Sequence, residues 1–313
     1  MNFLNYSVKR FLQVIPVLFG ISIGIFSLIH LIPGDPADTI LGQRADAARS
    51  AQIHHLLGID RPLVSQYFSF LNHIFHGSLG NSFFTQQPVT KLIVGRLSVT
   101  FFLLIGGLLF SLIISLPLAM WAASKEGGTR DQVVRVLPII GLGMPQVWTG
   151  LQLILLFGLK LKFFPVSGFG TTFWQHLRSS VLPCLAIALS LSPILIRSLR
   201  TSMLNIMESD FVLTASAKGL KRWRILIIHV VRNAVIASVT VLGVNIAYLV
   251  GATVVVERVF ALPGTGSMMI DAIGSRDFPV VQGVTLFFAI AVVIVNFATD
   301  VVHAALDPRV VIK

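Results

Sequence analysis

Long uncharged apolar blocks are the feature of this sequence that most limits how the chain can fold. Residues 99 to 123, 136 to 157, 233 to 256 and 279 to 299 contain no Asp, Glu, Lys or Arg. A helix of about 20 apolar residues is about 30 Å long, which matches the hydrocarbon core of a bilayer. Each block therefore predicts a membrane-spanning helix, and the pattern excludes a water-soluble fold.

Residues 11 to 32 form another uncharged block, and Lys9 and Arg10 precede it. Basic residues before an apolar run also occur in signal peptides. This run is longer than a signal peptide needs, and it leads into a Pro-Gly-Asp-Pro sequence at residues 33 to 36 rather than a small-residue cleavage site. We therefore predict an uncleaved first span.

A shorter apolar block at residues 181 to 196 contains Pro183 and Pro193. Its length is marginal for a span. We include it because an even number of spans returns both charged termini to one side, and because Arg197 and Arg200 follow it directly. The predicted fold is an all-α integral membrane protein with about six transmembrane helices.

The placement of the basic residues predicts the orientation of the chain. The formal net charge is +11, but the Lys and Arg residues lie between apolar blocks without the aromatic interleaving of a nucleic-acid surface. Cytoplasmic connections of membrane proteins carry an excess of Lys and Arg. That excess falls on one side when both termini are placed in the cytoplasm, so we predict a multi-pass protein of the bacterial cytoplasmic membrane with cytoplasmic N and C termini.

Residues 33 to 98 are too many for a simple connector, and we predict that they form an extracytoplasmic segment between helices 1 and 2. Apolar residues from Val64 to Phe75 recur at helical spacing, which predicts a helix lying on the membrane or on other spans. The predicted organisation is a first helix with this cap in residues 1–95, a transmembrane core in residues 96–307 and a cytoplasmic tail in residues 308–313.

Two serines and four histidines are the residues to consider for chemistry. Ser22 lies in a G-x-S-x-G pattern, but within an apolar span, where Gly20 and Gly24 favour close helix packing over a nucleophile. Ser167 follows Pro165-Val166 in a loop, which is a weak match to an intramembrane protease. No Cys or Glu completes a metal site with the histidines of the outer segment, His54, His55, His73 and His76. We predict no catalytic residue, cofactor or metal.

The absence of two further features limits which classes of membrane protein the sequence can belong to. The centres of the predicted spans carry no charged residue, which disfavours an ion-coupled carrier. The sequence also has no G-x-x-x-x-G-K-[ST] loop, so any energy from ATP must come from a partner.

The connection from residue 197 to residue 232 is the longest one on the predicted cytoplasmic side. Ala215, Ala217 and Gly219 have little side-chain bulk, which lets another protein approach the backbone closely. Glu208 and Asp210 precede these residues and basic residues follow them, a charge order that suits the dipole of a short helix. The segment is a candidate docking site.

This connection resembles the cytoplasmic segment of permease subunits of binding-protein-dependent ABC importers, in the dipeptide, oligopeptide, glutathione and nickel family. Leu213-Thr214-Ala215 followed by Gly219 occupies the place of the E-A-A-x-x-x-G pattern, with Leu213 where the family has glutamate. His229-Val230-Val231-Arg232-Asn233-Ala234 is similar to the H-x-L-R-N-A run. The resemblance assigns an ATPase-coupling segment to Phe211, Thr214, Ala215, Ala217, Lys218, Gly219, Leu220, His229, Arg232 and Asn233.

The resemblance extends over nearly the whole chain. In the outer segment it rests on residues 32 to 36, 57 to 62 and 77 to 82. Toward the C-terminus it rests on residues 257 to 260, 263 to 266, 277 to 283 and 306 to 309. It implies a type I ABC importer fold and a non-catalytic translocation subunit that pairs with a paralogous permease. Two ATP-binding cassette subunits and an extracytoplasmic solute-binding protein complete the implied transporter.

The resemblance leaves the solute open. Dipeptides or oligopeptides are the first expectation, with nickel or glutathione as alternatives. An ion-coupled secondary carrier and a membrane-embedded enzyme are the alternatives from other classes.

The predicted orientation can be tested by labelling single cysteines on a background that lacks Cys184. A cysteine at Ser69 should react with an impermeant thiol reagent added outside the cell, and a cysteine at Gly127 should react only after the membrane is opened. The reverse pattern would contradict cytoplasmic termini.

Overall fold

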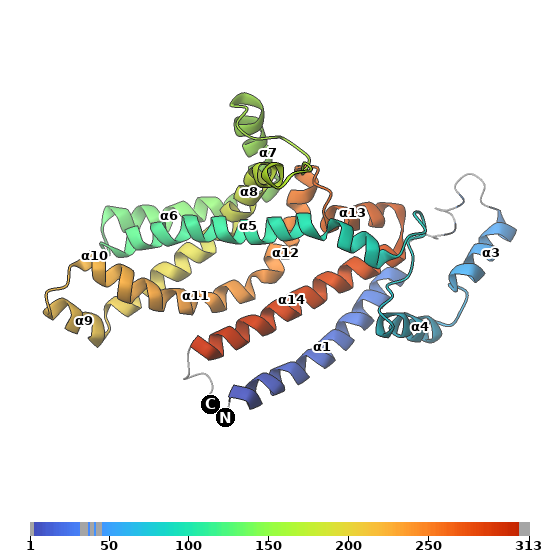
Figure 1. The fold of residues 1–313 in the computed structure, drawn as a ribbon, viewed down its shortest axis with the longest axis horizontal. Helices are drawn as coiled ribbons and strands as arrows, with labels where there is room; N and C mark the ends of the chain where they lie inside the picture. The colour runs from blue at the N-terminus through green and yellow to red at the C-terminus, as the bar shows by residue number, and fades with distance from the viewer. Residues whose placement is uncertain (1–2, 32–36, 38–40, 42–45, 307–313) are drawn as a thin grey trace. The chain divides into compact units, whose positions relative to one another are not determined.

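The computed structural model describes residues 3–31, 37, 41 and 46–306, and these residues form helices joined by turns and short loops (Figure 1). Within them, β-pairing is limited to an isolated bridge between Asn81 and Pro88. The motif at residues 32 to 36 lies wholly outside the described residues, and so does the predicted tail. Of the last motif, only Leu306 is described.

The chain divides into two compact units. One consists of the described parts of Met1–Arg10, Phe101–Leu262 and Ile294–Lys313, and the other of the described parts of Phe11–Thr100 and Pro263–Val293. Three long helices, α1 (Phe3–Leu31), α5 (Val89–Ala123) and α14 (Phe278–Leu306), contribute residues to both units.

The predicted spans all lie on helices of the described chain. The first, second, fourth and sixth correspond to α1 (Phe3–Leu31), α5, α8 (Phe173–Met207) and α14. The third is divided into α6 (Thr129–Gly143) and α7 (Gln146–Leu153), which continues as the π-helix η2 (Ile154–Lys160). The fifth is divided into α11 (Arg232–Val244) and α12 (Ile246–Val259). The predicted all-α membrane fold is therefore confirmed.

Helix breaks separate the halves of two predicted spans. The axes of α6 and of α7 with η2 differ in direction by 98°, and Pro145 stands at the start of α7. Asn245 separates α11 from α12, and its side-chain amide donates to the carbonyl of Val241 at 2.7 Å. Of the described helices, α5, α8 and α14 are individually long and apolar enough to cross a bilayer.

Helix α8 is the centre of the first unit, and here the sequence prediction was wrong about length. The apolar block at 181 to 196 is the middle of a helix of 35 residues that contains Pro183 and Pro193 without ending at either. Buried small side chains, such as Ala186 and Ala188, let α6, α7, α11 and α12 pack around it. Packing against these neighbours compensates for the backbone hydrogen bonds that the prolines remove.

Glycines allow α5 to approach α8 closely. A Cβ atom added at Gly107 would lie 2.6 Å from Cγ2 of Ile187, and one at Gly106 would lie 2.5 Å from Sγ of Cys184. Real Cβ atoms do not approach other atoms so closely. Van der Waals contact of this kind is the main force between helices in lipid, because apolar side chains gain nothing by leaving the lipid for each other.

In the second unit, α4 (Leu63–Phe75) packs one face on α1. The Tyr67 hydroxyl and the Ser22 hydroxyl are 2.9 Å apart, and the rings of Tyr67 and Phe26 meet edge to face at 5.3 Å. Val64, Phe68 and Phe75 on the same helix are exposed. The predicted amphipathic helix is therefore present, and part of it lies on a span.

Gly20 and Gly24 do not pack against another helix of the described chain. No atom lies within 4 Å of a Cβ built at either glycine, and both residues are exposed. The central Ser22 hydroxyl donates to the carbonyl of Phe19 at 2.7 Å, inside the helix. The residue that packs here is the serine.

Asp277 joins two sequence motifs that are far apart along the chain. Its carboxylate accepts hydrogen bonds from the Ser82 hydroxyl at 2.5 Å and from the Phe83 amide at 3.1 Å. Asp277 directly precedes α14, and its side chain is buried. The turn before α5 is thereby attached to the start of α14, next to α13 (Thr265–Ser275).

Replacing Gly107 with alanine should weaken the transporter by forcing α5 away from Ile187. Overpacking of this size costs about 1 to 3 kcal/mol, which should lower the thermal unfolding midpoint of the purified protein. Gly95→Ala is the matched control on the same helix, because a Cβ at Gly95 meets no atom within 4 Å. The double variant Gly107→Ala/Ile187→Ala should recover part of the loss. An unchanged midpoint for Gly107→Ala would show that α5 and α8 are not in this contact.

Candidate functional site

The predicted coupling segment contains a short helix, α9 (Asp210–Ala217), at the end of α8 (Figure 1). Ser209 stands at its N-terminus and Asp210 lies in its first turn, where a negative charge is favourable to the helix dipole. The predicted short helix is therefore present.

Gly219 ends α9 in the way its sequence position predicts. Its φ of 78° is in the left-handed region, which glycine adopts without strain. The amide of Gly219 donates to the carbonyl of Ser216 at 3.0 Å, and the amide of Leu220 donates to the carbonyl of Ala215 at 3.3 Å. These two bonds form a Schellman motif and fix the length of the helix.

One face of α9 is turned toward the chain itself, and this corrects the interpretation of Ala215. Ala215 is 8% exposed and Val212 is 5% exposed. The helix packs against α8 and α10 (Arg222–Ile225). Ala215 is small because α9 lies close to its own scaffold, so its side chain is not offered to another protein.

The opposite face of α9 is exposed in the described part of the chain. Phe211, Thr214, Ala217 and Lys218 are exposed, with 47% of the surface of Phe211 accessible. Residues three, four and seven positions apart lie on one side of a helix, so Phe211, Thr214 and Lys218 form one outward stripe. We call these four residues the outward face of α9.

The remaining predicted residues lie on the segment that follows. Leu220 is half-buried and lines a recess of about 260 Å³ beneath α9, together with Leu226 and Val230 of the π-helix η3 (Leu226–Val231). His229 is half-buried in η3. Arg232 and Asn233 are exposed at the start of α11, and the Asn233 amide donates to the carbonyl of His229 at 2.7 Å. The recess thus connects α9 with the H-x-L-R-N-A run.

A buried carboxylate that the sequence analysis did not single out anchors the end of α8. Asp131, in the first turn of α6, has no exposed surface, and both of its oxygens accept from the guanidinium of Arg200. The second of these bonds, from Nη2 to Oδ2, is 2.8 Å long. Arg200 is on the last turns of α8, before α9.

Two further groups complete the surroundings of Asp131. The Gly127 amide donates to Oδ2 at 3.1 Å, and Arg135 lies 3.2 Å from the same oxygen with half of its side chain exposed. A lone acid near several arginines was a visible signal in the sequence. Its partner was not, because Arg200 is 69 positions away.

Neither the metal site nor the nucleophilic site considered from the sequence is formed among the described residues. No group of three or more His, Cys, Asp or Glu that could hold a metal ion is present among them. Ser22 lies within a helix and bonds the carbonyl of Phe19, which is not the strand-to-helix turn that a nucleophile of this pattern needs.

Comparison with known families covers most of the sequence. Residues 115–312 match the family described as the inner membrane component of binding-protein-dependent transport systems. Residues 3–104 match the N-terminal part of the membrane component of such systems. The chain belongs to this family. It is a permease subunit of an ABC importer, and the candidate site therefore lies on a transport subunit.

Individual relatives are similar over their full lengths. The chain is 34% identical to the glutathione transport system permease protein GsiC of Pectobacterium atrosepticum, over 98% of this chain and 99% of that protein. It is 32% identical to the protein of the same name from Escherichia coli strain K12, with the same coverage.

A solved structure shows the same fold. The MetNI methionine ABC transporter, in an inward-facing conformation, contains a chain that superimposes with a TM-score of 0.55 and 17% sequence identity. The match covers 69% of the present permease and 97% of that chain. The importer fold implied by the sequence is thereby confirmed.

Removing the charge of Asp131 should destabilise this end of the permease. Asp131→Asn leaves the Arg200 cation without its partner, and breaking a buried pair costs about 3 to 5 kcal/mol. Lower amounts of assembled transporter and a lower unfolding midpoint in detergent should result. Arg135→Gln is the matched control, because a half-exposed pair contributes at most about 1 kcal/mol. Equal effects of the two changes would refute the anchoring role of Asp131.

Proposed function

We propose that this permease forms one half of the membrane channel of an ATP-driven importer for short peptides, among which glutathione is the leading candidate. The full-length similarity to permeases named for glutathione transport carries the proposal. Glutathione is itself a tripeptide, so this similarity agrees with the peptide class that the sequence motifs favour. A nickel substrate gains no comparable support.

The proposed transporter contains a paralogous permease, two ATP-binding cassette subunits and an extracytoplasmic solute-binding protein. We place both termini of the permease and α9 in the cytoplasm, as the basic residues favour. Residues 96–307 are proposed as the permease core. The chain contains no phosphate-binding loop, so ATP hydrolysis is assigned to the partner subunits.

We assign the contact with an ATPase subunit to the outward face of α9. An exposed phenylalanine is unfavourable in water and suits a pocket on a partner, since aromatic anchors carry much of the energy of protein interfaces. Ala217 beside it lets a partner approach closely, and Lys218 can meet an acidic side chain. Ala215, Val212 and Gly219 hold the helix in place.

The exposed and buried sides of α9 make different predictions. Phe211→Ala and Ala217→Arg should leave the permease folded and at normal levels in the membrane. Phe211→Ala should weaken ATPase association by about 30-fold, the effect of losing an anchor worth about 2 kcal/mol. Ala217→Arg should prevent close approach of the partner. Uptake of labelled glutathione by proteoliposomes containing the whole transporter and its receptor should fall with both variants.

Two controls separate coupling from folding. Phe75→Ala removes a phenylalanine of α4 that is 84% exposed, against 47% for Phe211, and should leave ATPase association and uptake unchanged. Ala215→Arg should instead lower the amount of folded permease, because Ala215 is buried. Normal uptake with Phe211→Ala and Ala217→Arg would refute the coupling role of the outward face. If the transporter takes up other tripeptides but not glutathione, the assignment as an importer stands and the assignment of glutathione as its substrate is wrong.

A further inference from the structure

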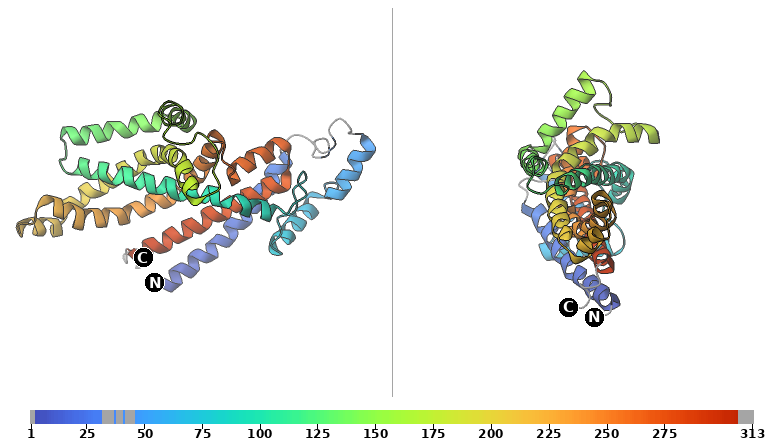
Figure 2. Two further views of the ribbon diagram at one scale, coloured as in Figure 1. Left: turned by 45° about the horizontal axis from the view of Figure 1, so that its top comes forward. Right: turned by 90° about the vertical axis from the view of Figure 1, so that its left-hand side faces the viewer.

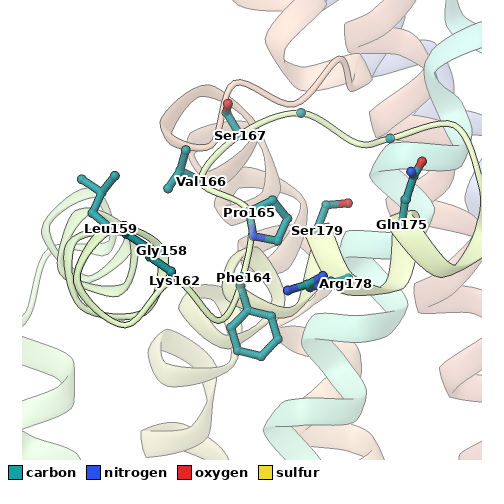
Figure 3. Close-up of a pocket in the computed structure, with 12 residues that line it drawn as sticks. Gly158, Leu159, Lys162, Phe164, Pro165, Val166, Ser167, Gln175, Arg178 and Ser179 are labelled. Carbon is teal, nitrogen blue, oxygen red and sulfur yellow. The ribbon is translucent and has the colours of Figure 1, made fainter.

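The other end of α8 borders a second recess, with a volume of about 710 Å³. Leu159 of η2, the loop that follows η2, and Arg178 and Ser179 of α8 line it (Figure 3). Pockets of this size hold small ligands. Arg178 and Ser179 lie near the start of α8, and Figures 1 and 2 show α9 at the opposite end of this helix, which is about 50 Å long.

The loop that builds this recess is firmly attached to its surroundings. A Cβ at Gly158 would lie 2.6 Å from Cγ1 of Val166, so the loop lies directly against η2. The Gln175 side chain accepts from the amides of Thr171 at 2.9 Å and Thr172 at 3.2 Å. The Ser179 hydroxyl donates to the carbonyl of Phe169 at 3.1 Å. The recess is therefore formed before any ligand enters.

The two charged residues that line this recess, Lys162 and Arg178, are both positive. Lys162 and Arg178 line it and are exposed, and neither makes an ion pair within the described chain. One guanidinium nitrogen of Arg178 donates to the carbonyl of Phe163 at 3.0 Å, which holds the group in place and leaves its other donors available. No Asp or Glu occurs in the sequence between Asp131 and Glu208. The protein itself therefore supplies no anion from this part of the chain.

Apolar surface leads up to the two cations. Leu155, Leu156 and Leu159 on η2 are each about half exposed. Close to the recess, Phe163, Phe173 and Trp174 are 57%, 66% and 74% exposed. Exposed aromatic side chains beside basic residues are typical of the level at which lipid headgroups meet water.

We propose that this recess binds the headgroup of an anionic phospholipid. The phosphate lies between the Lys162 ammonium and the free donors of Arg178. Ser167 and Gln175 offer polar groups to the rest of the headgroup. The acyl chains follow the exposed leucines of η2. Phosphate with an apolar tail satisfies both the unpaired charge and the adjoining apolar surface. A soluble anion satisfies only the charge.

The positions along α8 place this lipid in the leaflet opposite to α9. With α9 assigned to the cytoplasm, the leaflet is the outer one. Lys160, Lys162 and Arg178 then form an excess of positive charge on the side where membrane proteins ordinarily have few such residues. An anionic lipid accounts for that excess. The lipid site does not depend on which solute the importer carries.

Native mass spectrometry of the assembled transporter, purified in mild detergent, tests the proposal. Phosphatidylglycerol and phosphatidylcholine with identical acyl chains are titrated separately. The wild type should bind phosphatidylglycerol preferentially. Each cation near a membrane surface changes affinity for an anionic lipid by about fivefold, so Lys162→Gln/Arg178→Gln should weaken phosphatidylglycerol binding by about 30-fold. The single variant Lys162→Gln, which keeps the Arg178 bond to Phe163, should weaken it by about fivefold.

The matched control is Lys91→Gln/Lys125→Gln, which removes two exposed cations outside the recess and should not change lipid preference. Unchanged phosphatidylglycerol binding by the pocket variants would overturn the proposal. Inorganic phosphate that binds the recess as tightly as phosphatidylglycerol would also overturn it, because the recess would then be a site for soluble anions. If the variants instead raise only the KM for glutathione uptake, the recess belongs to the solute pathway and the lipid assignment fails while the importer function stands.

Discussion

Close packing around α8 is the constraint on which the first unit depends. In lipid, helices are not driven together by water, so their contact relies on matching surfaces and small residues. Gly106 and Gly107 let α5 approach α8, and the buried alanines of α8 admit its other neighbours. A helix surrounded in this way tolerates Pro183 and Pro193, because its neighbours replace the support that the missing backbone bonds would give. The length of α8 in turn sets the separation of the two recesses.

The basic residues of the chain have three different environments, and the net charge alone does not distinguish them. Arg200 is paired with the buried Asp131 and serves the structure. Lys218 and its neighbours after α9 are exposed to water on the side we assign to the cytoplasm. Lys162 and Arg178 border an apolar surface without an acidic partner in the described chain. The net positive charge of the sequence therefore combines residues with three roles: an internal ion pair, exposed residues on the side assigned to the cytoplasm, and the residues of the proposed lipid site.

Hydropathy was sufficient to predict the spans, because the thickness of a bilayer fixes the length of an apolar block. It failed for the ends of α8, since Pro183, Pro193 and Arg197 are usual signs of a helix end and only tertiary packing overrides them. Small residues were visible in the sequence, but their neighbours were not. Gly107 is in close contact and Gly24 is not, although both lie in apolar helices. The Schellman end at Gly219 was predictable because it depends on local backbone geometry alone.

The construction of α9 bears on how a nucleotide signal could reach the membrane. The helix is short and ends in a fixed turn, and its buried side contacts α8 and α10, so it cannot move far without its scaffold. Asp131 at the start of α6 is bound to Arg200 on the last turns of α8, which precede α9 in the chain. The pair therefore joins α6 and α8 close to α9 in the sequence. Under the proposed contact with an ATPase, a displacement of α9 would be passed to α6 and α8 together. Rigid motion of packed helices about such a point is the form of change that alternating access requires.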